Sequence, residues 1–121
     1  MKMRVLVVDD CKGMRTVLSA VLESVGYSVE TAADGLSGLA RFMADPPDAI
    51  ITDVNMPVMD GLTFVGEVRR QSRGADLPIF VLSSDGSADK RERARGYGVR
   101  RWLDKPADMT AMAAAVLQAT G

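Results

Sequence analysis

The 121-residue sequence has no histidine and only one cysteine. A tetrahedral zinc site, a histidine general base and an internal disulfide are therefore excluded. No apolar run approaches the roughly 18 residues that a membrane-spanning helix needs, and the apolar stretch at the start is too short for a signal peptide. At this length the chain is expected to form one cytoplasmic domain with a single core.

An excess of charge of one sign is also missing, because the net charge is only −1. Residues 1–60 carry nine acids and five bases, whereas residues 61–121 carry seven acids and ten bases. This balance gives no indication of nucleic-acid binding. Residues 86–105 hold seven bases and three acids. That stretch is either a solvated helix face or a surface for an acidic partner.

Apolar residues alternate along the chain between two patterns. Short apolar runs are typical of strands buried on both faces, and stripes spaced by three and four residues are typical of amphipathic helices. Strands are predicted at residues 3–8, 28–32, 49–52, 78–82 and 99–103. Helices are predicted at residues 14–25, 36–44, 61–71, 88–95 and 109–117. This strict alternation predicts an α/β domain with a parallel sheet and right-handed crossovers.

Polar residues follow four of the predicted strands. Asp9-Asp10, Asp53, Ser83 and Lys105 stand at or just beyond the strand ends. In an open parallel sheet, ligands bind at the carboxyl ends of the strands, so these side chains are expected to converge. Three carboxylates close together repel one another and have raised pKa values unless a cation lies between them. A hard divalent ion such as Mg²⁺ is the expected remedy.

The remaining groups at these strand ends point to phosphate chemistry. Lys105 supplies a positive point charge for phosphate oxygens, and Ser83 supplies a hydrogen-bond donor. Such a set is typical of phosphoryl transfer, in which the protein positions groups and balances charge. Because histidine is absent and no cysteine is suitably placed, an aspartate is the expected nucleophile. Asp53 is the predicted phosphoacceptor because it ends the central strand.

With these residues in place, the sequence resembles the receiver domains of bacterial response regulators, in particular the single-domain, CheY-like members. The resemblance covers residues 3–117 and rests on Asp9-Asp10, the segment DVNMPVMDG at 53–61, Ser83 and Lys105-Pro106. It implies a doubly wound, flavodoxin-like sheet of five parallel strands in the order 2-1-3-4-5, flanked by five helices. It also implies a domain that catalyses only its own phosphorylation and dephosphorylation.

The resemblance implies roles for four residues around the metal. Mg²⁺ would be held by the carboxylates of Asp10 and Asp53 and by the backbone carbonyl of Asn55, and Asp9 would reach it through water. Asp53 would receive its phosphoryl group from a sensor histidine kinase or a histidine phosphotransfer protein.

The resemblance also implies a switch. Lys105 would contact the phosphoryl oxygens, with a cis peptide bond before Pro106. Ser83 would be the switch hydroxyl, and Trp102 stands at the aromatic switch position, where the family usually has tyrosine or phenylalanine. The fourth helix, fifth strand and fifth helix would meet a downstream target. Residues 1–121 are expected to be a monomeric receiver domain with no output domain, and chemotaxis is one process that uses such domains.

Three other functions remain open. An aspartate-based phosphatase on a similar sheet usually needs a second aspartate two residues after the first, where this chain has Asn55. A nucleotide- or flavin-binding module needs a phosphate cradle after the first strand, where Asp9-Asp10 would repel phosphate without a metal. A receiver-like adaptor that acts without phosphorylation is the third alternative, and the intact set of acids, hydroxyl and lysine argues against it.

Overall fold

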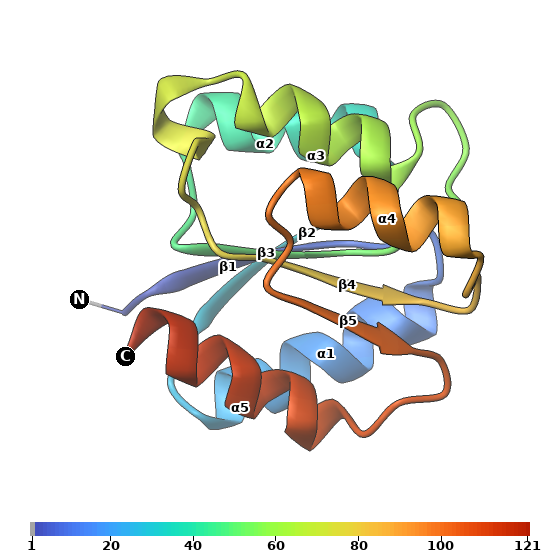
Figure 1. Cartoon of the computed structure of the whole chain (residues 1–121). Coiled ribbons are helices and arrows are strands. Elements are labelled where there is room, and N and C mark those ends of the chain that lie inside the picture. The colour runs from blue at the N-terminus through green and yellow to red at the C-terminus, as the bar shows by residue number, and fades with distance from the viewer. Residues whose placement is uncertain (1) are drawn as a thin grey trace.

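The computed structural model describes residues 2–121, which form one five-stranded sheet with helices on both faces (Figure 1). The strands are β1 (Arg4–Val8), β2 (Ser28–Ala32), β3 (Ala49–Thr52), β4 (Ile79–Ser83) and β5 (Arg101–Asp104). The helices are α1 (Lys12–Ser24), α2 (Gly35–Ala44), α3 (Gly61–Arg69), α4 (Ala88–Gly96) and α5 (Met109–Thr120), with a short 3₁₀ helix, η1 (Ser72–Gly74).

All strand pairs are parallel, and the strand order is β2-β1-β3-β4-β5. This confirms the predicted doubly wound α/β fold. Within residues 2–121, no helix is both long enough and apolar enough to cross a membrane.

The helices cover the sheet in two layers, with α1 and α5 on one face and α2, α3 and α4 on the other (Figure 1). Because side chains alternate along a strand, each buried strand supplies both layers. In β1, Val5 and Val7 pack with α1 and α5, whereas Leu6 and Val8 pack with α2 and α3. The buried strands β1, β3 and β4 are therefore apolar on both sides, as their unbroken apolar runs indicated.

Three helices begin at an aspartate whose carboxylate accepts a backbone N–H of the first turn, which satisfies a group that the helix itself leaves free. These caps are Asp34 to Ser37 at 2.8 Å, Asp60 to Thr63 at 2.8 Å and Asp108 to Thr110 at 2.9 Å. In the first two, the capping aspartate is followed directly by a glycine, Gly35 or Gly61, which is the first residue of the helix.

Gly61, at the start of α3, lies against the end of β3. A Cβ at this position would lie 1.7 Å from the carbonyl oxygen of Asp53, so only glycine fits. Its N–H donates to the carbonyl of Val54 at 2.7 Å. Gly61 thereby fixes the path of the chain directly after the predicted phosphoacceptor.

Several predicted element ends differ from the structure by one to three residues, among them the end of α3 and the start of β5. Helix α3 stops at Arg69, and η1 follows it. Strand β5 begins at Arg101, because the N–H of Val99 donates to the carbonyl of Ala94 and closes the end of α4. Gly98, with φ +72°, makes that reversal possible.

Helix α4 is the most polar element of the fold. Ala94 is its one buried residue. Ion pairs join its Lys90 to Asp85 and its Arg91 to Asp104. Since few apolar contacts hold α4 to the sheet, we expect it to open at a lower free energy than the rest of the domain.

Candidate functional site

The strand register brings the predicted site residues to one edge of the sheet. Val8 of β1 pairs with Thr52 of β3, and the N–H of Asp53 donates to the carbonyl of Val8 at 2.9 Å. Asp9 and Asp53, the next residues, therefore lie side by side. On the other side of β3, the N–H of Lys105 donates to the carbonyl of Ser83 at 2.8 Å and extends the pairing of β4 with β5.

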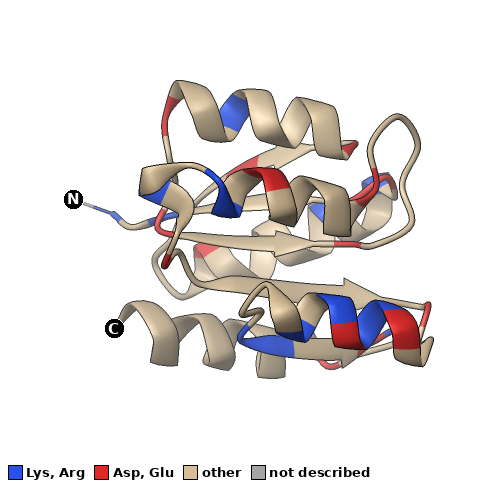
Figure 2. Ribbon diagram, turned by 45° about the horizontal axis from the view of Figure 1, so that its top comes forward, with Lys and Arg blue, Asp and Glu red and all other residues tan. Residues whose placement is uncertain are grey.

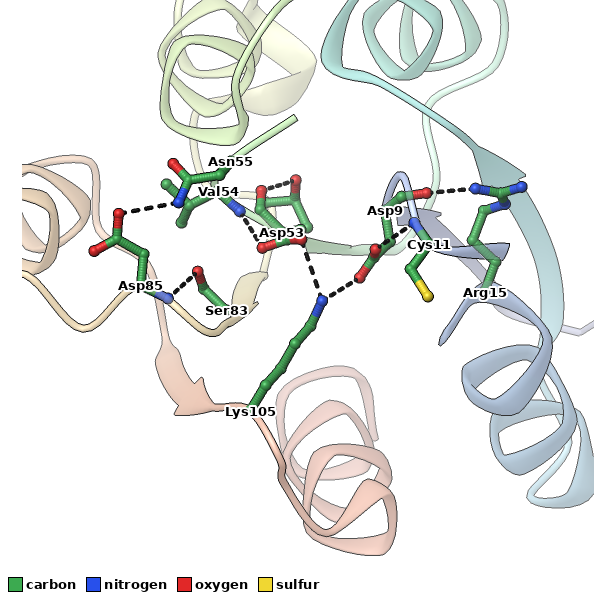
Figure 3. A network of polar contacts seen from close by, with 10 residues as sticks. Asp9, Cys11, Arg15, Asp53, Val54, Asn55, Ser83, Asp85 and Lys105 are labelled. Atoms are coloured by element: carbon green, nitrogen blue, oxygen red, sulfur yellow. Dashed lines mark hydrogen bonds and ion pairs between the residues drawn. The ribbon is translucent and has the colours of Figure 1, made fainter. Parts of the chain in front are cut away.

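Three carboxylates meet at this edge, and Figure 3 shows two of them, those of Asp9 and Asp53, from close by. Oxygen atoms of Asp9, Asp10 and Asp53 all lie within 4.8 Å of one another. Asp9 and Asp53 are buried, and Asp10 is exposed. The ammonium of Lys105 lies between the two buried acids, 3.0 Å from Asp9 and 3.2 Å from Asp53. The convergence predicted for these four residues is thus present.

Burial and charge set the pKa values here. Burial raises the pKa of Asp53, and the charge of Asp9 adds to this, although the Val54 N–H and Lys105 act in the opposite direction. Burial lowers the pKa of Lys105, but its hydrogen bond to Asp9 and the charge of Asp53 outweigh that effect and leave the pKa raised. Lys105 therefore remains an ammonium at neutral pH, while the site is costly for a third negative charge.

Backbone contacts orient the two buried acids. The N–H of Val54 donates to Oδ1 of Asp53 at 2.7 Å, and Lys105 contacts Oδ2. The N–H of Cys11 donates to Oδ1 of Asp9 at 2.9 Å, and Arg15 of α1 donates to the Asp9 carbonyl at 2.7 Å. Each carboxylate is thus held in one orientation, facing the other.

The β4 side of the edge contains contacts that the sequence did not indicate. The hydroxyl of Ser83, which is fully buried, accepts the N–H of Asp85 at 3.1 Å. The side chain of Asn55 donates to Asp85 at 3.0 Å and accepts from Lys90 at 2.8 Å. The hydrogen bonds from Lys90 and Asn55 lower the pKa of Asp85. Asp85 and Lys90 follow β4 in a loop and a polar helix, where no periodic pattern marks them.

Trp102 lies on β5, beside α4. It is half-buried and packs against the apolar cluster of Val54, Leu62, Val81 and Ala94. The peptide bond between Lys105 and Pro106 is cis, which confirms that expectation.

The donor set fits a divalent cation. Three carboxylates and one ammonium leave an excess of two negative charges at this edge, and all the acidic donors are hard oxygen atoms. Mg²⁺ prefers such ligands and often takes only one or two carboxylates from a protein. The side chain of Asn55 is engaged by Asp85 and Lys90, which leaves its backbone carbonyl as the donor that it could offer.

Comparison with known proteins gives concordant results. The family model for the response regulator receiver domain matches residues 5–117. Response regulator MprA of Mycobacterium tuberculosis (strain H37Rv) is 44% identical over 108 residues, which are 88% of this chain and 45% of MprA. The chain thus spans less than half the length of such curated relatives.

Solved structures agree with this match. The chemotaxis protein CheY4 of Vibrio cholerae is 39% identical with a TM-score of 0.91, over 98% of this chain and 99% of that one. A CheY-like receiver domain protein of Methanospirillum hungatei, 20% identical, shares the fold with a TM-score of 0.92, over 98% of this chain and 93% of that one. Strand order, acidic edge and the match over residues 5–117 together show that the chain belongs to the response regulator receiver domain family of two-component systems.

Proposed function

We propose that the domain is a phosphorylation switch in which Asp53 accepts a phosphoryl group from the phosphohistidine of a partner kinase or phosphotransfer protein. One observation carries this proposal: the oxygens of Asp9, Asp10 and Asp53 gather within 4.8 Å at the carboxyl edge of the sheet, and Lys105 bridges two of them. A charge arrangement of this kind suits phosphate bound together with a divalent cation.

In the proposed transfer, a carboxylate oxygen of Asp53 attacks phosphorus while the bond from phosphorus to the donor histidine nitrogen breaks. The electron pair of that bond stays on the imidazole nitrogen, and an aspartyl phosphate results. Asp10, Asp53 and the backbone carbonyl of Asn55 would hold Mg²⁺, and Asp9 would reach the ion through water. The ion would supply positive charge that offsets the charge of the phosphoryl oxygens. The Val54 N–H keeps the Asp53 carboxylate oriented for the attack.

Lys105 and Ser83 are proposed to bind the new phosphoryl group. Lys105 already contacts Asp53 and, as an ammonium, can turn from the carboxylate to the phosphoryl oxygens. The Ser83 hydroxyl accepts a hydrogen bond from Asp85, so its own proton is available to a phosphoryl oxygen. Charge-assisted hydrogen bonds of this kind contribute roughly 1.5–3 kcal/mol each, so two or three supply the roughly 5.5 kcal/mol that carries a switch from 1:99 to 99:1.

The response to phosphorylation is proposed to reach the surface formed by α4, β5 and α5. Ser83 ends β4 next to Asp104 of β5 in the register, and Trp102 lies on the same edge strand. Figure 2 shows acidic and basic residues side by side along α4 and basic residues where β5 begins. A target with an acidic segment would be attracted to this surface, and its association would weaken at high salt.

The test is incubation of the protein with Mg²⁺ and a small acyl phosphate, followed by intact mass spectrometry. The wild type is expected to gain one phosphate, and EDTA is expected to prevent it. Asp53→Asn should gain none, whereas Asp76→Asn, an exposed acid outside the site, should behave as the wild type. Labelling of Asp53→Asn, or no labelling of the wild type, refutes the proposal, and the second result favours an adaptor that acts without phosphorylation.

A further inference from the structure

Trp102 is tied to its surroundings by a closed set of three polar contacts, which we call the Trp102 anchor (Trp102, Asp104 and Arg91). The indole N–H donates to Oδ1 of Asp104 at 3.1 Å. The guanidinium of Arg91 lies 5.1 Å from the centre of the indole ring and also binds both carboxylate oxygens of Asp104. Each member thus contacts the other two.

The anchor joins β5 to α4, a helix with few buried residues. Trp102 and Asp104 are two residues apart on the edge strand β5 and so lie on the same side of it. Arg91 belongs to α4, whose one buried residue is Ala94. With so few apolar contacts, the anchor is a substantial part of what holds α4 beside β5.

The inner side of the Trp102 ring connects to the phosphorylation site. Its apolar cluster includes Val54, the residue whose N–H holds Oδ1 of Asp53. A change at Asp53 can therefore reach the indole through the packed side chains of this cluster. The outer side of the ring, with its N–H, is held by the anchor.

We propose that Asp104 and Arg91 are positioning residues that hold Trp102 in the position it has in the unphosphorylated protein. They thereby set the fraction of molecules that adopt the activated conformation before phosphorylation. The inference rests on the proposed function. A conformational equilibrium shifts only through interactions that differ between its two states. The anchor exists only while Trp102 stays in contact with both Asp104 and Arg91. Movement of Trp102 toward the site breaks the anchor and releases Arg91 to pair with an acidic target.

The test uses the single tryptophan of the chain, labelled as 5-fluorotryptophan and observed by fluorine NMR. Asp104→Ala and Arg91→Gln each remove one of the two side chains that hold Trp102 in the anchor. Asp76→Ala and Arg93→Gln are the matched controls, because each removes the same charge without touching Trp102. Resonance position and phosphorylation rate with acyl phosphate and Mg²⁺ are recorded in the same samples.

Without phosphorylation, Asp104→Ala and Arg91→Gln are expected to shift the resonance toward its position in the phosphorylated wild type. The phosphorylation rate should rise about tenfold in Asp104→Ala, which loses the charge-assisted hydrogen bond to the indole. It should rise roughly threefold in Arg91→Gln, which loses the cation–π contact. A purely structural role would lower stability but would not speed up phosphorylation.

Intact mass, which reports phosphate incorporation, distinguishes failure of the anchor proposal from failure of the proposed function. Normal phosphate incorporation, with resonance and rate in Asp104→Ala equal to those in Asp76→Ala, overturns the anchor and leaves the proposed function in place. No incorporation in the wild type overturns the proposed function itself.

Discussion

Neutralising the predicted phosphoacceptor should make the metal-free protein more stable. At an effective dielectric constant of about 20, two like charges no more than 4.8 Å apart repel by at least about 3.5 kcal/mol, and the Lys105–Asp53 pair at 3.2 Å attracts by about 5 kcal/mol. Asp53→Asn relieves two repulsions, with Asp9 and Asp10, and loses one attraction. The balance raises the free energy of unfolding by on the order of 2 kcal/mol at pH 7.

The pH dependence follows from the raised pKa of Asp53. A carboxyl whose pKa is raised in the folded state contributes stability below its ordinary value of 3.8, and this contribution is lost as the pH rises through the folded pKa. The advantage of Asp53→Asn is therefore present at neutral pH and disappears as the pH falls toward 3.8.

In Mg²⁺, the wild type should become more stable than Asp53→Asn. An ion at a hundredfold excess over its dissociation constant stabilises the folded state by about 2.7 kcal/mol, and Asp53→Asn, with one carboxylate fewer, gains less. Urea unfolding at pH 7 in EDTA and in Mg²⁺ measures both effects, with Asp76→Asn as the control. Equal or lower stability of Asp53→Asn in EDTA, or an equal gain from Mg²⁺ in both proteins, would refute this reasoning.

Three further substitutions test separate parts of the structure. Lys105→Ala should keep Mg²⁺ binding, measured by titration of Trp102 fluorescence, but lose the fluorescence change on phosphorylation; a normal change contradicts the role given to Lys105. Arg69→Ala should lower the free energy of unfolding by about 2–4 kcal/mol, because three backbone carbonyls each accept from its guanidinium at 2.7 Å; a loss under 1 kcal/mol in urea unfolding argues against it. Val58→Gly should raise that free energy by about 1 kcal/mol, because Val58 has φ +70° and is 76% exposed; a decrease contradicts the strain.

The buried strands could be predicted from sequence because each is an apolar run with polar ends. The predicted limits of β3 agree with the structure residue by residue, as do those of β2, an edge strand that is only partly buried. The start of the edge strand β5 was predicted two residues early, because Val99 has an apolar side chain although it closes the end of α4. An apolar residue is evidence for burial, and here burial occurs in a turn.

The site, too, was predictable from the sequence only in part. The meeting of Asp9, Asp53 and Lys105 was predictable because the ends of neighbouring parallel strands share one edge. The hydrogen bond from the Asn55 side chain to Asp85 could not be predicted, because it depends on the geometry of two loops and loops have no periodic sequence pattern. The Trp102 anchor was partly accessible, since residues two apart on a strand share a side, but the contribution of Arg91 depends on how α4 lies on the sheet.

The most direct test of the phosphorylation site is reductive mapping of the acyl phosphate. After reaction with acyl phosphate and Mg²⁺, borohydride converts a phosphorylated aspartate to homoserine, and peptide sequencing by mass spectrometry locates it. We predict homoserine at position 53 alone. Homoserine at position 9 or 10 instead, or phosphate on a side chain that borohydride does not reduce, would contradict the account.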